Sequence, residues 1–167
     1  MSNHSIFTKA NIKHISIIQD IARKSWESAY AKILSHEQIE YMLGEMYSTK
    51  EITSHLENPN YHYYLIDNEG EFVGFIGFEH HYEPAITKLH RVYLIPEAKG
   101  KGLGKEAINL LKEKFTESGN QRIILNVNKE NNARKIYESQ GFRIYDEIIL
   151  DIGSGFVMDD YLMEFRI

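Results

Sequence analysis

The segment over residues 91–105, RVYLIPEAKGKGLGK, constrains the fold of this chain more than any other part of the sequence. Apolar residues typical of a buried strand lead into a loop that carries Gly100, Gly102 and Gly104, and a helical pattern follows at once. Glycine has no Cβ atom to keep an anion from the backbone, and the start of a helix offers unpaired N–H groups at the positive end of its dipole. The segment therefore predicts a phosphate-binding loop between a strand and a helix.

Two well-known phosphate loops fit this segment poorly. A Walker loop needs glycine where Lys99 stands and serine or threonine where Glu106 stands, so it is excluded. The stretch over residues 102–107 does satisfy the permissive dinucleotide-binding pattern. However, the strand before it lies in an antiparallel run in the middle of the chain, and no acidic residue follows the next strand at the expected place. A dinucleotide is therefore the weaker alternative for this loop.

The spacing of apolar residues predicts the other elements. Before residue 60, apolar residues recur every three or four positions, which indicates helices over residues 15–30, 35–46 and 50–56. Short β-prone segments with turn signals between them indicate strands. The expected strands cover residues 5–9, 61–66, 71–78, 87–95, 122–127, 142–150 and 161–165, and two further helices cover residues 104–118 and 132–139.

The order of these elements favours one α+β domain over residues 1–167. A chain of 167 residues normally folds around a single hydrophobic core. The strand over residues 87–95, the helix over residues 104–118 and the strand over residues 122–127 form a βαβ crossover, which requires two parallel strands. The hairpins on either side are antiparallel, so we expect a mixed sheet.

Composition excludes several classes of protein. A formal net charge of −5 and the absence of a long Lys/Arg run argue against nucleic acid as a partner, and they favour cationic substrates. The chain has no cysteine, which removes disulfides and thiolate chemistry. Residues 1–12 contain no apolar run that would serve as a signal peptide or membrane span. We therefore expect a cytoplasmic protein without a membrane partner.

Two segments resemble the GNAT superfamily of acetyl-CoA-dependent N-acetyltransferases. KGKGLG at residues 99–104 resembles the acetyl-CoA loop of that superfamily, although Lys99 stands where Gln or Arg is usual. LNVNKENNARKIYESQGF at residues 125–142 is similar to a second family pattern through Asn131, Ala133, Tyr137 and Gly141-Phe142. The order of elements matches over the last hundred residues, and the helical first third matches in layout.

The resemblance also implies the details of the fold and a narrower branch. A GNAT domain has a mixed, mostly antiparallel sheet of about six to seven strands that is splayed in the middle, with helices on both faces. DIGSGFVMDDYLMEF at residues 151–165 and SWESAY at residues 25–30 look like the bacterial polyamine (spermine or spermidine) acetyltransferases. A primary amine of a small molecule is then the expected acceptor. The sequence does not decide whether the protein forms a homodimer.

The same resemblance assigns the residues that would hold acetyl-CoA as co-substrate. The strand at Val92, Tyr93 and Leu94 would bond the pantetheine arm through its backbone, as an added strand does. Asn126 and Asn131 lie near the gap beside it, and Asn131 alternatively caps the helix that begins near Asn132. The phosphate contacts would come from Lys99, Gly100, Lys101, Gly102, Leu103, Gly104 and Lys105.

Tyr137 is the expected general acid, placed by the resemblance within reach of the cofactor sulfur. Packing on the buried face of its helix is the alternative. Glu79 and His90 are candidates for the base that removes a proton from the amine, and a surface Glu with a structural His is at least as consistent with the sequence. Neighbouring His80 and His81 should point to opposite faces of a strand, so no metal site is expected.

Trp26 and Tyr30 lie one turn apart on the first helix and could wall an ammonium pocket by cation–π contact, although such aromatics usually belong to the core. Asp159 and Asp160 could bind a cationic substrate or form an exposed acidic turn. Two other functions remain open. One is N-terminal acetylation of a peptide or ribosomal protein, and the other is a non-catalytic acetyl-CoA sensor, which the presence of Tyr137 and Asn131 disfavours.

Overall fold

The computed structural model describes residues 6–167. Ser5, the first residue of the expected N-terminal strand, lies outside the described residues. The helices are α1 (Ile15–Tyr30), α2 (His36–Met46), α3 (Thr49–Glu57), α4 (Leu103–Ser118) and α5 (Ala133–Ser139), with short 3₁₀ turns η2 (Ile12–His14) and η3 (Pro96–Ala98). The strands are β1 (Phe7–Lys9), β2 (Tyr61–Asn68), β3 (Glu71–Glu83), β4 (Ile86–Leu94), β5 (Arg122–Asn128), β6 (Arg143–Gly153) and β7 (Phe156–Arg166). No helix within residues 6–167 is long and apolar enough to cross a membrane.

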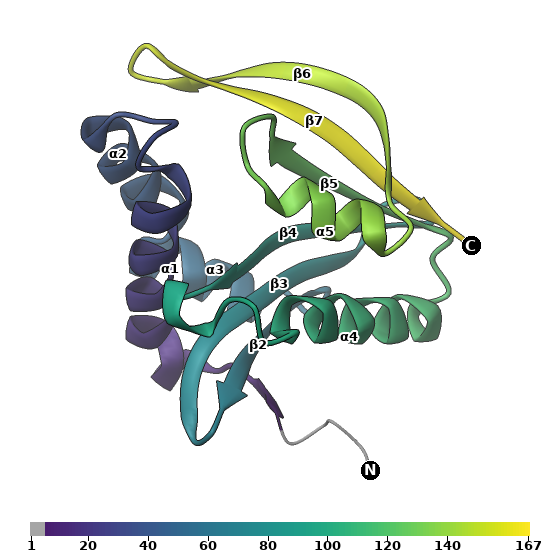
Figure 1. The fold of residues 1–167 in the computed structure, drawn as a ribbon. Coiled ribbons are helices and arrows are strands. Elements are labelled where there is room, and N and C mark those ends of the chain that lie inside the picture. Colours follow the sequence, from purple (N-terminus) through teal and green to yellow (C-terminus); the bar gives the residue numbers. More distant parts are fainter. Residues whose placement is uncertain (1–5) are drawn as a thin grey trace.

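The strands of residues 6–167 form one seven-stranded sheet in the order β1-β2-β3-β4-β5-β7-β6 (Figure 1). Only β4 and β5 run parallel, and helix α4 makes the crossover between them, since parallel neighbours need a long connection. β4 pairs with β5 only from Ile86 to Leu89, although β4 continues to Leu94. The expected mixed, mostly antiparallel sheet that is splayed in the middle is confirmed.

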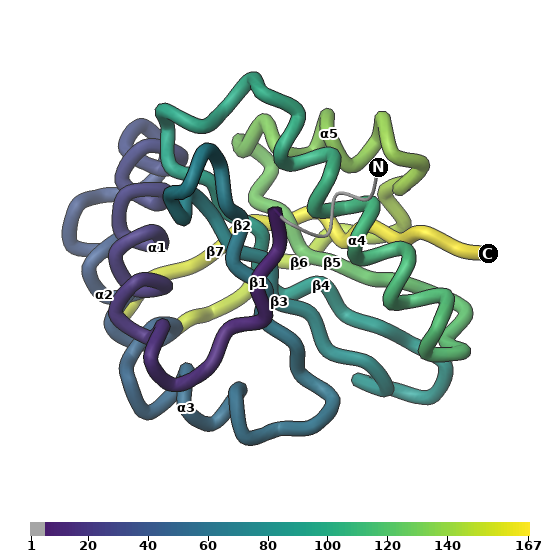
Figure 2. Tube along the Cα trace, turned by 90° about the horizontal axis from the view of Figure 1, so that it is seen from below, coloured from purple at the N-terminus to yellow at the C-terminus, as the bar shows by residue number. Residues whose placement is uncertain are grey.

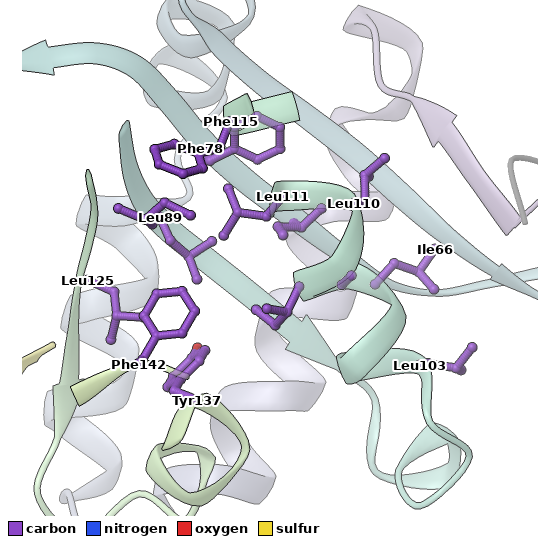
Figure 3. Close-up of a cluster of buried hydrophobic side chains, with 14 of the residues drawn as sticks. Ile66, Phe78, Leu89, Leu103, Leu110, Leu111, Phe115, Leu125, Tyr137 and Phe142 are labelled. Carbon is purple, nitrogen blue, oxygen red and sulfur yellow. The ribbon is translucent and has the colours of Figure 1, made fainter. Parts of the chain in front are cut away.

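Helices cover both faces of the sheet, as Figure 2 shows with α1, α2 and α3 on one side and α4 and α5 on the other. Each face has its own set of buried side chains. The α4-side core includes Ile66, Phe78, Leu89, Leu111, Phe115, Leu125, Tyr137 and Phe142 (Figure 3). The α1-side core includes Ile18, Trp26, Tyr30, Met42, Ile52, Tyr63, Phe75 and Met158. The splay between β4 and β5 lies between the two cores, so side chains from both faces of the sheet can meet there.

Serine caps mark the starts of two helices, α2 and α3. Ser35 and Ser48 adopt extended backbone before α2 and α3, and their hydroxyls accept bonds from Gln38 N and Glu51 N. Such serine caps satisfy amides that a helix start leaves unpaired. The predicted bounds of the helices differ from those in the structure by at most one or two residues.

The strands at the end of the chain are longer than the sequence predicted. β7 begins at Phe156 and not near residue 161, because positive φ angles at Gly153, Ser154 and Gly155 make a tight turn that lets β6 and β7 pair from that turn onward. β3 likewise runs past Phe78 to Glu83, with an irregularity at His81, whose φ is 56°. Asp159 and Asp160, for which an exposed acidic turn was one interpretation, thus lie within strand β7.

Candidate active site

A cavity of about 460 Å³ runs through the splay between β4 and β5. α1, β4, the glycine loop, β5 and α5 all contribute to its walls. The residues of this wall that the sequence singled out are Tyr30, His90, Val92, Tyr93, Leu94, Lys99, Gly100, Gly102, Leu103, Gly104, Lys105, Asn126, Asn131 and Tyr137. Lys101, Glu79 and Trp26 do not line it. Most of the proposed site residues therefore meet at one cavity.

Beyond Leu89, the end of β4 offers to this cavity a backbone edge with which no strand of residues 6–167 pairs. In an antiparallel pair, alternate residues bond to opposite neighbours, and the bond from Ile95 N to Val73 O fixes that alternation. Tyr93 then bonds toward β3, whereas Val92 and Leu94 present their backbone groups to the splay. The Ser25 hydroxyl donates to the Leu94 carbonyl at 2.9 Å and ties α1 to this edge. An extended ligand can add here as a strand does.

The glycine loop needs glycine for conformational reasons at two positions. Gly100 and Gly102 have φ angles of 82° and 78°, a region that other residues rarely adopt. Gly102 ends the loop, and α4 begins at Leu103, one residue before the expected start. The amides of the first turn of α4 have no partner within the helix, and they open toward the cavity with the positive end of the helix dipole. The loop is built as an anion site.

Asn131 connects the loop before α5 to α1. Its Oδ1 atom accepts a bond from Ala133 N at 2.9 Å, and its Nδ2 atom donates to the Tyr30 hydroxyl at 3.1 Å. The side chain thus bonds the first residue of α5 and reaches across the cavity with a different atom. Trp26 lies elsewhere than expected, because only 2% of it is exposed and it packs behind Tyr30 with 4.5 Å between ring centroids. Tyr30 alone of this pair faces the cavity.

Tyr137 reaches the cavity from α5, beside Phe142 (Figure 3). Its ring centroid lies 5.9 Å from that of Phe142, and its hydroxyl makes no hydrogen bond within residues 6–167. Burial raises the pKa of Tyr137, and neighbouring Tyr30 acts in the same direction. The phenol therefore keeps its proton at neutral pH and is available as a donor.

His90 and Glu79 are in contact across β4 and β3, with 3.0 Å between His90 Nε2 and Glu79 Oε1. Burial lowers the pKa of His90 to about 3, and the positive charges of Lys88 and Arg91 add to the effect. The imidazole is therefore neutral, and because a carboxylate only accepts, Nε2 donates to Glu79. His90 lines the cavity, and Glu79 stands behind it with 21% of its side chain exposed.

Of the two neighbouring aspartates, only one is an exposed surface residue. Asp159 is half exposed and lies 3.0 Å from Lys129 Nζ. Asp160 is only 5% exposed, so the expected acidic turn is wrong for this residue.

The neighbouring residues His80 and His81 have different surroundings. His80 Nδ1 bonds the Thr87 hydroxyl at 2.9 Å, whereas His81 is exposed. Within residues 6–167, no group of acidic or histidine side chains is arranged to hold a metal ion.

The model of the acetyltransferase (GNAT) family matches residues 17–142. The chain belongs to this family. The spermidine N(1)-acetyltransferase of Thermoplasma acidophilum is 27% identical over 156 residues, which cover 90% of this chain and 93% of that protein. The crystal structure of a PaiA N-acetyltransferase from Thermoplasma acidophilum, in complex with coenzyme A, matches with a TM-score of 0.84 at 25% identity over 96% of this chain and 98% of that one. The Escherichia coli ribosomal-protein-S18-alanine N-acetyltransferase matches with a TM-score of 0.72 at 16% identity over 96% and 92% of the two chains, which shows a shared fold alone.

Acetyl-CoA is the co-substrate of this GNAT protein, and the residues present fit it. The unpaired edge at Val92 and Leu94 suits an extended arm that bears amides, and the loop before α4 suits a pyrophosphate. Positive φ at Gly100 and Gly102 excludes side chains where phosphates would approach. The cavity joins both features.

Sequence reasoning missed a buried polar cluster behind the GNAT cavity. Arg91 is 8% exposed, donates from Nη1 to the Tyr63 hydroxyl at 2.9 Å, and lies 4.4 Å from the centre of the Tyr47 ring. Tyr61 stacks on both His55 and His90, at 4.3 and 4.9 Å. Its members come from β2, β4, α3 and the residue after α2, so no single local motif could have indicated the cluster. Through the ring of Tyr61, the cluster packs against His90 and positions its imidazole.

Proposed function

We propose that this acetyltransferase transfers the acetyl group of acetyl-CoA to a primary amine of a small molecule, and that polyamines are its substrate class. The observation that carries the proposal is the cavity through the splay. Its walls include the glycine loop and Tyr137 from the α4 side of the sheet and Tyr30 and His90 from the α1 side. The similarity to a spermidine N(1)-acetyltransferase over 90% of this chain supports the choice of polyamines.

The chain would hold its co-substrate through backbone groups. Acetyl-CoA supplies an activated acetyl thioester, and the edge at Val92 and Leu94 binds its arm as a strand binds its neighbour. The amides over residues 100–105 bind the phosphates, and the lysines of the loop add positive charge. Asn126 and Asn131 border the same passage.

Tyr137 serves in this proposal as the acid that protonates the leaving thiolate. Its phenol stays protonated because burial raises its pKa, and it has no competing hydrogen bond within residues 6–167. A proton donor held in position accelerates such a step by roughly 10²- to 10⁴-fold.

His90 and Glu79 serve as the route by which the ammonium loses its proton. His90 is neutral and lines the cavity, so it can accept a proton there, and Glu79 at 3.0 Å leads from it toward solvent. A pKa of about 3 makes His90 a weak base by itself, so the carboxylate of Glu79 is needed to stabilise the imidazolium. A His90→Asn variant with wild-type turnover at every pH would contradict this route.

A small acceptor is favoured over a peptide by the cover on the α1 side of the sheet. The Tyr41 hydroxyl of α2 donates to the Ile152 carbonyl at 2.8 Å, and Gln38 Nε2 donates to the Val157 carbonyl at 3.0 Å. These bonds hold the tip of the β6–β7 hairpin against α2. We infer that this closed contact leaves less room on the α1 side for an extended peptide than for a small amine.

The test is release of coenzyme A thiol with a panel of amines. Spermidine, spermine, an aminoglycoside, free amino acids and short peptides are compared at equal concentration. We expect polyamines to give the highest kcat/KM. Turnover of peptides alone would contradict the polyamine proposal, and binding of acetyl-CoA without turnover of any amine would indicate a sensor.

A further inference from the structure

The carboxylate of Asp160 is buried on the α1 side of the sheet, and it forms no ion pair with any cation of residues 6–167. Its exposed fraction is 5%, and its Oδ1 atom has no hydrogen-bond partner among the described residues. A buried carboxylate oxygen without a hydrogen-bond partner is costly, so its presence calls for an explanation. No step proposed above uses it.

The register of the sheet shows which way Asp160 faces. Along β7, Met158 lies in the α1-side core, whereas Met163 lies in the α4-side core. Since side chains alternate along a strand, Asp160 shares the face of Met158. Its partner across β5 is Asn128, and Asn126 lies two residues further along the same face of β5. Asp160 therefore lies on the α1 side of the sheet, in the strand next to β5.

Two cavity residues lie close enough to interact with this carboxylate. Burial raises the pKa of Asp160, and the Asn126 amide, which donates toward it, offsets part of that rise. Burial also raises the pKa of Tyr30, and the charge of Asp160 contributes to that effect. Asn126 of β5 and Tyr30 of α1 both line the cavity. Asp160 does not itself line the cavity, but it lies directly behind these two wall residues.

Nearby cations are already engaged. Lys129, the lysine beside this part of β7, contacts Glu147 and Asp159 through Nζ, so it does not neutralise Asp160. The guanidinium of Arg91 bonds to Tyr63 and packs on Tyr47. Among the described residues no ion pair neutralises Asp160, so its carboxylate is open to a cation from outside the chain.

We propose that Asp160 binds an ammonium group of the acceptor, so that the site selects amines that arrive charged. The proposal rests on the proposed function, because it concerns the acceptor of that same reaction. Asn126 and Tyr30 supply neutral polar contacts beside the ion pair. An amine that is uncharged at neutral pH gains nothing from Asp160, so the residue determines specificity without touching the acetyl group.

The experiment measures binding of spermidine to the protein saturated with coenzyme A, by calorimetry, in wild type, Asp160→Asn and Asp159→Asn. Asparagine keeps the size of the side chain and removes its charge. A charge-assisted contact of this kind is worth a loss of about 10- to 100-fold in affinity. We expect that loss in Asp160→Asn and a change below about twofold in Asp159→Asn, whose carboxylate is half exposed and screened. Affinity for coenzyme A should be unchanged in both.

Kinetics with two amines separate a charge effect from a structural one. Asp160→Asn should raise KM for spermidine and leave KM for aniline, which is neutral at pH 7, near the wild-type value. An equal loss for both amines, or unchanged binding of spermidine, would overturn the role of Asp160. Because binding is measured apart from turnover, absence of turnover in wild type contradicts the proposed function instead.

If Asp160→Asn does not fold, the wild-type protein still decides the question. The ¹³C carboxyl signal of Asp160 should shift when spermidine is added to the complex with coenzyme A. If added spermidine shifts other signals of the protein but not the carboxyl signal of Asp160, the proposal is overturned.

Discussion

Burial sets the protonation of the side chains that face the cavity from the two sides of the sheet. It raises the pKa of Tyr137, which therefore remains a phenol, and it lowers the pKa of His90, which therefore remains a neutral imidazole. One can give a proton and the other can accept one at neutral pH. The same environment opposes the charge on Asp160, whose Oδ1 atom has no hydrogen-bond partner within residues 6–167.

Tyr137→Phe separates the chemical role of the hydroxyl from the packing of the ring. We expect turnover to fall by about 10²- to 10⁴-fold, because a positioned acid is lost. Affinity for acetyl-CoA and the melting temperature should change little, since the ring stays against Phe142 and the hydroxyl makes no hydrogen bond within residues 6–167. Tyr145→Phe, on the exposed part of β6, is the matched control. Wild-type turnover in the Tyr137→Phe variant, under conditions where chemistry limits the rate, would remove Tyr137 from the mechanism.

At the scale of elements, the loop and the first turn of α4 combine two kinds of glycine. Gly100 and Gly102 are required by their positive φ, so any substitution there strains the backbone and blurs a binding test. Gly104 differs, because it is helical, and a Cβ atom there would lie 3.9 Å from Leu94 Cδ1 and 4.0 Å from Ile136 Cδ1. It marks the narrow passage between β4 and α5.

Gly104→Ala should therefore weaken binding while it strengthens the fold. The added methyl group occupies the passage and should lower affinity for coenzyme A by roughly tenfold, whereas alanine in a helix is about 0.8–1 kcal/mol more favourable than glycine. Gly44→Ala in α2 is the control, because a Cβ there meets nothing within 4 Å. It should raise the free energy of unfolding equally without changing affinity. Unchanged binding in Gly104→Ala would show that the arm takes another path.

How well each element could be predicted depends on whether its signal is local. The glycine loop, α4 and the segment from Asn131 to Phe142 carry turn and cap residues at fixed spacing, so they were placed nearly correctly from the sequence. The length of β7 and the burial of Asp160 depend on pairing between β5, β6 and β7, which no single stretch specifies. The contact of Arg91 with Tyr63, 28 residues earlier, is of the same kind. Sequence therefore indicated the cofactor side of the site better than the acceptor side.

For the molecule as a whole, half-buried neutral histidines set the response to acid. Burial is the main cause that lowers the pKa of His55 and His80 to about 4 and that of His90 to about 3, whereas an unfolded histidine titrates near 6.5. The unfolded chain thus binds protons first as the pH falls. Their contribution to stability is complete above pH 6.5 and is lost between 6.5 and the folded values.

The free energy of unfolding should therefore fall below pH 6.5, by at most about 1.4 kcal/mol per pH unit for each of the three histidines. Urea titrations at pH 7.5, 6, 5 and 4.5 measure this slope. His55→Phe, which keeps the ring stacked on Tyr61, should make the slope shallower. A free energy of unfolding that stays constant from pH 7.5 to 5 would show that these histidines are not held neutral in the fold.

The bonds between α2 and the β6–β7 hairpin also bear on the order in which the coenzyme A site and the amine site form during folding. They join residues 111 and 119 positions apart, so they close only after the last strands have been made and inserted beside β5. The glycine loop, α4 and the crossover to β5 involve neighbouring stretches of chain and can assemble earlier. A chain emerging from the ribosome would thus form its coenzyme A-binding site before its amine-binding site. Acetyl transfer would begin only after the final strand has folded.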